Sequence, residues 1–403
     1  MKHGKAVEAS AFDRLSQGLV AGRDSRLHSP ESLRKPAVSP RHNPGETTTR
    51  SMSNSTSYGF PVRPLGGVAF GHAIDTAGVP SAAAVERFEA DPRELLALFY
   101  AGHGLLVVEG LCEVGGRPEL LVRMSRLFGP EVENYRQTLT TANFFHDSVD
   151  EILVLSNLPP CSFEPPPRPA PPVTEDGGLP IRFPHRRGWH TDQSYRRPPP
   201  DVSLLLGVRC PAQGQGQTLY ADCISAYASL PASTRDRIAD RVGLHAMRGT
   251  GRSEPEVLAG AARKPLLAHQ MPQGHRLVRT HPITGEQTLY LCDGGQMDFV
   301  DGPIVGLAPG PGNTGAELLR DLLEHITESR HVYVHEWNEG DLVIHDNRTM
   351  LHTPTWYDSA KYPRVMWRTT VTGNPGVEYA DLSKSWIPAE GGNPMAGLED
   401  LEF

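Results

Sequence analysis

The chain has 403 residues, of which 39 are Lys or Arg and 47 are Asp or Glu, and its formal net charge is −8. No long block of one charge sign occurs, which argues against a nucleic-acid partner and favours a small molecule. No stretch approaches the roughly 18 consecutive apolar residues of a membrane-spanning helix, so we expect no membrane partner. The 40 Gly and 37 Pro residues indicate many turns and disfavour a helical bundle.

The five cysteines are odd in number and scattered, and they form no C-x-x-C pair. This pattern predicts neither a disulfide framework nor a structural zinc site. Since no secretory signal is visible either, we expect a reduced, cytoplasmic protein. The cysteines are Cys112, Cys161, Cys210, Cys223 and Cys292.

Residues 1–57 are rich in Ser, Thr, Arg and Pro and have no helical or strand period. This composition predicts a disordered N-terminal extension, followed by one folded domain over residues 58–403. The extension is either dispensable, with translation starting at Met52, or a regulatory tail.

The first part of the domain alternates helical and extended patterns. Residues 92–99 and 118–128 have apolar residues at helical spacing, whereas residues 101–111 and 151–156 read as strands. A Pro-rich segment over residues 157–180 follows, which is too long for an ordinary connection and predicts a lid over a binding site. The alternative is an ordered surface insertion with no role.

From Gly188 onward the sequence is mostly short extended segments, interrupted by one helical stretch over residues 225–242. Short strands at close spacing with Gly- and Pro-rich connections predict a sandwich, barrel or jelly roll. The expected strands are WHTDQSY, DVSLLLGVR, QTLYADC, RLVRTH, QTLYLCD, HVYVHEW, DLVIHD and RVMWRTTVTG.

Two histidines and one carboxylate stand out among the candidate metal ligands. His190 and Asp192 are two residues apart, so on an extended segment both side chains point to the same face. His352 follows the strand-like DLVIHD. Two His and one carboxylate on β-elements are the facial triad of non-haem Fe(II) oxygenases, which leaves metal positions open. The competing interpretation is a hydrogen-bonded core histidine beside a surface aspartate.

Arg364 and Arg368 lie 12 and 16 residues after His352. Because they are four residues apart, both face the same side of a strand. Each guanidinium offers a planar fork that binds a carboxylate with two hydrogen bonds. The pattern therefore predicts metal ligands and anion anchors in one cavity.

The order of the motifs WHTD, GQTLYAD, RTHPITGEQTLYL, GDLVIHDNRTMLH and R-x-x-x-R, between residues 101 and 373, resembles the taurine dioxygenase and 2,4-dichlorophenoxyacetate dioxygenase family. The resemblance implies a mainly β fold with flanking helices, a double-stranded β-helix of the jelly-roll or cupin-like kind. It also implies Fe(II), 2-oxoglutarate as cosubstrate, O2 and a homo-oligomer, either dimer or tetramer.

Carried over to this sequence, the resemblance implies that His190, Asp192 and His352 bind iron. Thr218 and Arg364 would hold the distal carboxylate of 2-oxoglutarate.

The substrate side of the site departs from the best-known family members. Arg368 matches the position that binds the anionic group of their substrates. Asn134 and Arg186 stand at two further substrate-contacting positions, where taurine dioxygenase has His and Asn, so taurine is doubtful as the substrate. His345 occupies a position where the family usually has Trp before Asp-Asn.

The resemblance implies hydroxylation of a small, anionic organic substrate with release of succinate and CO2. Cleavage of a carbon–heteroatom bond, desaturation or cyclisation stays open, whereas halogenation is disfavoured because Asp192 is present. Two alternatives belong to other classes. One is a non-catalytic β-barrel protein that binds 2-oxoglutarate or another anion, and the other is a Zn-dependent hydrolase on the same ligand set.

Overall fold

The computed structural model describes residues 56–138, 144–168, 188–263, 265–374, 376–379 and 384–385. The chain divides into two units, Met1–Met52 and Ser53–Phe403, and all described residues belong to the second. The predicted substrate residue Arg186 lies outside the described residues. So do residues 1–55 of the predicted extension and the second half of the predicted lid, and both interpretations stay predictions.

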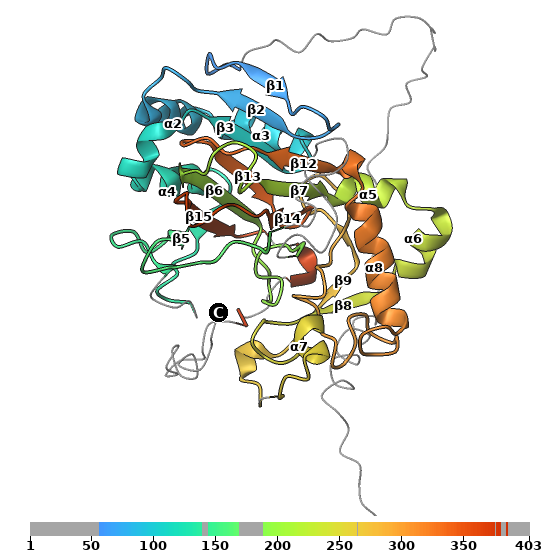
Figure 1. Ribbon diagram of the computed structural model, residues 1–403. Helices are drawn as coiled ribbons and strands as arrows, with labels where there is room; N and C mark the ends of the chain where they lie inside the picture. The colour runs from blue at the N-terminus through green and yellow to red at the C-terminus, as the bar shows by residue number, and fades with distance from the viewer. Residues whose placement is uncertain are drawn as a thin grey trace, which may run out of the picture. The chain divides into compact units, whose positions relative to one another are not determined.

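The larger of the two main sheets has eight strands (Figure 1). Its neighbours pair antiparallel except for β2 and β3, which are parallel. Seven strands follow one another across the sheet in the order β1 (Val62–Pro64), β2 (His72–Asp75), β3 (Leu105–Glu109), β13 (Leu342–Asp346), β6 (Val202–Arg209), β15 (Val365–Thr372) and β4 (Glu131–Val132). The eighth strand, β5 (Leu153–Ser156), pairs with β15.

The smaller sheet has three antiparallel strands, in the order β12 (Val332–His335), β7 (Thr218–Asp222) and β14 (Met350–Pro354). An isolated bridge between His190 and His352 extends this sheet beyond β14. Two further antiparallel pairs are β8 (Val242–His245) with β9 (Gln273–Arg276), and β10 (Val278–Thr280) with β11 (Gln287–Leu289).

Alternation along the strands separates two apolar layers. On β13, Leu342 and Ile344 pack in the cluster that also contains residues of α2, α3 and α4. Val343 faces the other way, into a cluster with Tyr220 and Met350 of the smaller sheet. Because successive side chains of a strand point to opposite faces, the second cluster fills the space between the two sheets.

Helices cover the outer side of each sheet (Figure 1). Those beside the larger sheet are α2 (Ser81–Ala90), α3 (Pro92–Ala101) and α4 (Glu119–Arg126), and those beside the smaller sheet include α5 (Cys223–Ser229) and α8 (Thr314–Ile326). The remaining α-helices among the described residues are α6 (Ala232–Ile238) and α7 (Glu254–Leu258). The start of α3 shows how the sequence sets such a boundary: the Asp91 side chain accepts a hydrogen bond from the Arg93 backbone N–H, and Pro92 occupies the first turn.

The predicted helices at 92–99 and 118–128 correspond to α3 and α4. One predicted strand is wrong. Within WHTDQSY only His190 forms a bridge, and the chain turns at Asp192, because Gln193 adopts a left-handed backbone conformation with φ of 50°. The strand β14, which carries His352, and the helix α8 were not predicted from the sequence.

Candidate active site

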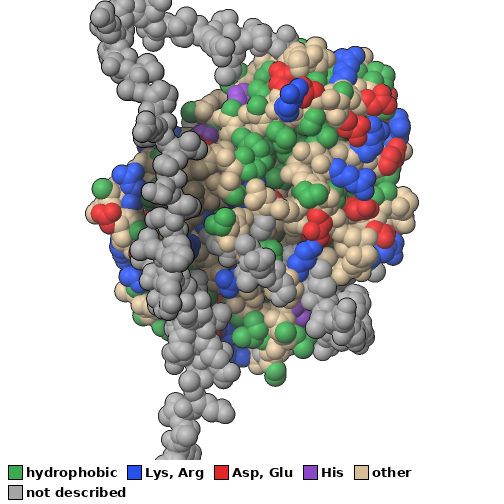
Figure 2. All heavy atoms as spheres, turned by 180° about the vertical axis from the view of Figure 1, so that it is seen from behind, with side chains coloured by type: hydrophobic (Ala, Val, Ile, Leu, Met, Phe, Trp, Pro, Cys, Tyr) green, Lys and Arg blue, Asp and Glu red, His purple; other side chains and the backbone are tan. Residues whose placement is uncertain are grey.

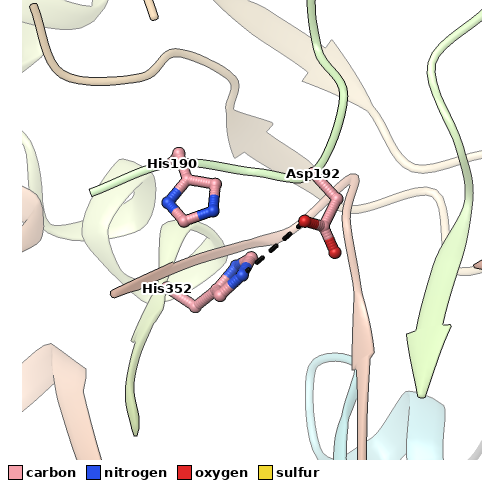
Figure 3. A group of neighbouring side chains, drawn as sticks. All are labelled: His190, Asp192 and His352. Carbon is pink, nitrogen blue, oxygen red and sulfur yellow. Dashed lines mark ion pairs between the residues drawn. The ribbon is translucent and has the colours of Figure 1, made fainter. Parts of the chain in front are cut away.

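His190, Asp192 and His352 come together between the two sheets (Figure 3). One potential ligand atom from each of the three residues lies within 4.8 Å of the others. The bridge explains part of this convergence, since the backbones of His190 and His352 exchange hydrogen bonds of 3.0 and 2.8 Å. The turn after His190 then brings Asp192 Oδ1 to 3.8 Å from His352 Nε2.

Ser203 of the larger sheet and Asn347, directly after β13, hold the Asp192 carboxylate in place. The Ser203 hydroxyl on β6 donates to Asp192 Oδ2 at 2.7 Å, and the Asn347 amide donates to Ser203 Oγ at 2.8 Å. The Asn347 side-chain oxygen in turn accepts from the Asp192 backbone N–H at 3.2 Å. Hydrogen bonds of this kind orient ligands and tune a metal site.

Burial and neighbouring charge set the protonation states of the three residues. Burial lowers the pKa of His190 and of His352 to about 3. Burial alone would raise the pKa of Asp192, but the positive charge of Arg368, followed by the nearby histidines, brings it below its ordinary value. At neutral pH the site thus presents two neutral imidazoles and one carboxylate. Metal binding requires this state of these ligands, and the donor set suits Fe(II) with open positions.

Arg368 on β15 forms an ion pair with Asp192 Oδ1. Its guanidinium also interacts with the buried Tyr135 side chain. The Tyr135 hydroxyl lies 2.6 Å from Thr370 Oγ1, which fixes the ring. The structure therefore brings Arg368 directly beside the triad.

Thr218 lies on β7, two residues before Tyr220, and Arg364, directly before β15, is close enough to Tyr220 for their charges to interact. The Trp337 indole N–H donates to Thr218 Oγ1 at 3.0 Å, so the hydroxyl hydrogen of Thr218 can still be donated to another group. Arg364 contacts the Tyr357 ring, with the guanidinium carbon 5.9 Å from the ring centroid. Its Nε is buried without a hydrogen-bond partner, and no carboxylate among the described residues pairs with its side chain. An arginine in these surroundings is available for an anion.

Asn134 has a local partner. Its side-chain oxygen accepts a hydrogen bond from the Arg136 backbone N–H at 3.0 Å. The next residue, Tyr135, is the one whose side chain reaches Arg368. The substrate-contacting roles of Asn134 and Arg186 stay predictions.

The family profile described as "Taurine catabolism dioxygenase TauD, TfdA family" matches residues 61–370. The chain belongs to the TauD/TfdA family. Enzymes of this family are Fe(II)- and 2-oxoglutarate-dependent dioxygenases. The predicted enzyme class, its cofactors and the mainly β, jelly-roll fold are therefore confirmed.

Two curated relatives illustrate the range of the TauD/TfdA family. Pentalenolactone F synthase from Streptomyces arenae is 31% identical over 230 residues, which are 55% of this chain and 69% of the relative. The alpha-ketoglutarate-dependent 2,4-dichlorophenoxyacetate dioxygenase from Cupriavidus pinatubonensis is 34% identical over 184 residues, which are 45% of this chain and 59% of the relative.

Solved structures of the TauD/TfdA type share the fold. The crystal structure of AAD-2 in complex with Mn(II) and N-oxalylglycine superimposes with a TM-score of 0.54 at 25% identity, covering 78% of this chain and 98% of AAD-2. A taurine dioxygenase from Burkholderia xenovorans gives a TM-score of 0.54 at 22% identity, covering 78% of this chain and 91% of that protein.

The surface gives less information than the TauD/TfdA site. Figure 2 shows a face where basic and acidic side chains alternate and hydrophobic side chains gather between them. None of the helices in the described part of the chain is long and apolar enough to cross a bilayer.

Several residues around the triad were not predicted from the sequence. These are Ser203, Tyr220 and Asn347, and His345 was noted only as the position where the family usually has Trp. His345 is buried, with Nε2 3.8 Å from Asp192 Oδ2. Strand alternation could have placed it there, because it lies two residues after the interior Val343.

Proposed function

We propose that the protein hydroxylates a small anionic organic substrate and converts 2-oxoglutarate to succinate and CO2. The observation that carries this proposal is the convergence of His190, Asp192 and His352, with Arg364 close enough to Tyr220, the strand partner of His352, for their charges to interact. Bound Fe(II) and 2-oxoglutarate supply the activation of dioxygen that C–H hydroxylation needs. The three triad residues would hold the metal.

The protein's own residues would orient the metal ligands and bind the cosubstrate. Ser203 holds Oδ2 of Asp192, which favours one orientation of the carboxylate. Thr218 and Arg364 would bind the distal carboxylate of 2-oxoglutarate, the threonine as a single donor and the arginine as a charged fork. Because Thr218 is buried and Arg364 is half-buried, these contacts form in a partly desolvated interior, where they are stronger than in water.

The anionic substrate class rests on Arg368 and on the relatives. The names of the relatives include a 2,4-dichlorophenoxyacetate dioxygenase, an (S)-phenoxypropionate dioxygenase and a sulfate ester dioxygenase, whose substrates carry an acidic group. We propose that Arg368 binds such a group, with Asn134 and Arg186 as further substrate contacts. Residues 157–180 would form the lid over this side of the site.

Turnover tests the proposal directly. The Fe(II)-loaded protein is supplied with 2-oxoglutarate and a panel of carboxylates, sulfonates and sulfate esters, while oxygen consumption and succinate are measured. We expect succinate formation that an anionic panel member stimulates, with a KM that rises about tenfold or more in Arg368→Ala, the loss expected for a charge-assisted hydrogen bond.

The matched control is Arg209→Ala, which removes an exposed arginine that pairs with Glu339 on the surface. Its KM should equal that of the wild type. No succinate in the presence or absence of any panel member, with Fe(II) verified as bound, would refute the proposed activity.

We further propose that the enzyme is cytoplasmic and works as a dimer or tetramer. All five cysteines are free in the structure, as a reducing compartment requires. Light scattering coupled to size-exclusion chromatography tests the oligomer, and a monomeric mass would contradict it.

A further inference from the structure

Tyr220 and His345 carry buried polar atoms that the metal triad does not use. The Tyr220 hydroxyl and both ring nitrogens of His345 have no hydrogen-bond partner, and the same holds for Arg364 Nε. Buried polar groups in folded proteins are nearly always hydrogen-bonded, so each exception requires an explanation.

All of these atoms belong to one region. Tyr220 is the strand partner of His352, and their rings stack with centroids 6.0 Å apart. The His345 ring lies 4.6 Å from the His352 ring and 5.3 Å from the Tyr220 ring, measured between centroids.

Tyr220 connects this cluster to the predicted carboxylate site. It follows Thr218 by two residues on β7, so both side chains leave the same face of the strand. The charges of Asp192 and Arg364 both act on its hydroxyl group. Tyr220 therefore lies close both to the triad and to the arginine that would bind the far end of 2-oxoglutarate.

We propose that Tyr220 and His345 are additional binding residues for the 2-oxo acid and hydrogen-bond to its oxygen atoms. The inference rests on the proposed function. A 2-oxo dicarboxylate is rich in acceptor oxygens and would extend from the metal towards Arg364, so it would accept hydrogen bonds from the Tyr220 hydroxyl, from the one N–H of the neutral His345 ring and from Arg364 Nε. A phenylalanine could pack at either position without a buried, unpartnered polar atom. The polar atoms of Tyr220 and His345 therefore contribute only if a polar ligand hydrogen-bonds to them.

Binding of N-oxalylglycine to the full-length, Mn(II)-loaded protein tests this inference without turnover. This analogue of 2-oxoglutarate is bound together with Mn(II) in the AAD-2 crystal structure. Isothermal titration calorimetry should show about tenfold weaker binding in Tyr220→Phe and in His345→Phe, since each variant removes hydrogen-bonding capacity but keeps an aromatic ring. His345→Gln, which retains an N–H donor, should recover part of the loss.

The matched control is Tyr333→Phe. Tyr333 is the strand neighbour of Tyr220 on β12, but its hydroxyl lies 3.2 Å from His335 Nδ1 and thus has a partner. This variant should bind N-oxalylglycine like the wild type. The Mn(II) affinity should stay unchanged in all of these variants.

Two results would overturn the inference. One is a dissociation constant within threefold of the wild-type value in both Tyr220→Phe and His345→Phe, while Arg364→Ala still weakens binding. The other is a parallel loss of Mn(II) affinity in these two variants, which would assign both residues to the metal site. Absence of N-oxalylglycine binding by the wild type would instead refute the proposed function itself.

Discussion

Asp192 is the residue on which most interactions of the site converge. Its Oδ1 faces Arg368 and His352, and its Oδ2 accepts from Ser203. Ser203→Ala should therefore lower Fe(II) affinity about 10- to 100-fold, because hydrogen bonds to a ligand orient it and tune its basicity. Competition with a chromophoric chelator measures the effect.

Ser125→Ala is the control for this variant, because Ser125 is an equally buried serine whose hydroxyl bonds to Leu121 O and Thr369 Oγ1 away from the triad. It should reduce stability but leave Fe(II) affinity unchanged. Equal Fe(II) affinities in Ser203→Ala and the wild type would show that Ser203 does not orient the ligand.

The sequence predicts a site residue when its role follows from its type and its spacing to other site residues. The spacing of His190 and Asp192 and the position of His352 predicted a group that the structure does bring together. Ser203 and Asn347 could not be found in this way. Their contacts depend on the pairing of β6 with β13, and sequence alone does not reveal which strands are neighbours.

Among the backbone elements, the turn that presents His190 depends on Gly188. This glycine has φ of 99°, and an added Cβ would lie 1.8 Å from Asp293 Oδ2. Gly188→Ala should lower the free energy of unfolding by about 1–3 kcal/mol more than a control glycine variant. It should also weaken Fe(II) binding, since His190 is two residues away.

Gly214→Ala provides that control, because Gly214 has φ of 83° but open space around the added Cβ. Chemical denaturation and chelator competition compare the two variants. If both variants lose the same stability and keep their Fe(II) affinity, the close approach of Gly188 to Asp293 does not position His190.

Strands built around a run of apolar residues were predictable, whereas strands without such a run were not. DVSLLLGVR and DLVIHD became β6 and β13, two neighbours in the larger sheet. The strand β14 was missed because its sequence, MLHTP over Met350–Pro354, has no apolar–polar alternation and ends in proline, which disfavours a strand. WHTDQSY looked extended, but the left-handed conformation of Gln193 ends the extended segment.

Over the molecule as a whole, the described apolar core clusters extend from Tyr58 to Val371. This distribution supports the prediction that the folded domain begins near residue 58. A protein that lacks residues 1–55 should keep the Tm and the 2-oxoglutarate affinity of the full chain. Differential scanning calorimetry measures the Tm, and anaerobic titration measures the 2-oxoglutarate affinity. A Tm lower by more than about 4 °C would correspond to at least about 1 kcal/mol of lost stability. Such a loss would contradict a dispensable extension.

The jelly-roll class was predictable from the short strands and from the order of the motifs. The arrangement of the larger sheet was not, because β1, β2 and β3 from the start of the domain join β13 near its end. Pairing between segments so far apart in the sequence is set by packing in three dimensions rather than by local pattern.

Anaerobic titration of the Fe(II)-loaded protein with 2-oxoglutarate is the most direct test of the proposed cofactor site. The wild type should develop a visible metal-to-ligand charge-transfer band. Asp192→Ala should lose the band, and Arg364→Ala should need at least about tenfold more 2-oxoglutarate to reach it. A wild type that binds Fe(II) but gives no band would contradict the assignment of His190, Asp192, His352 and Arg364 to this site.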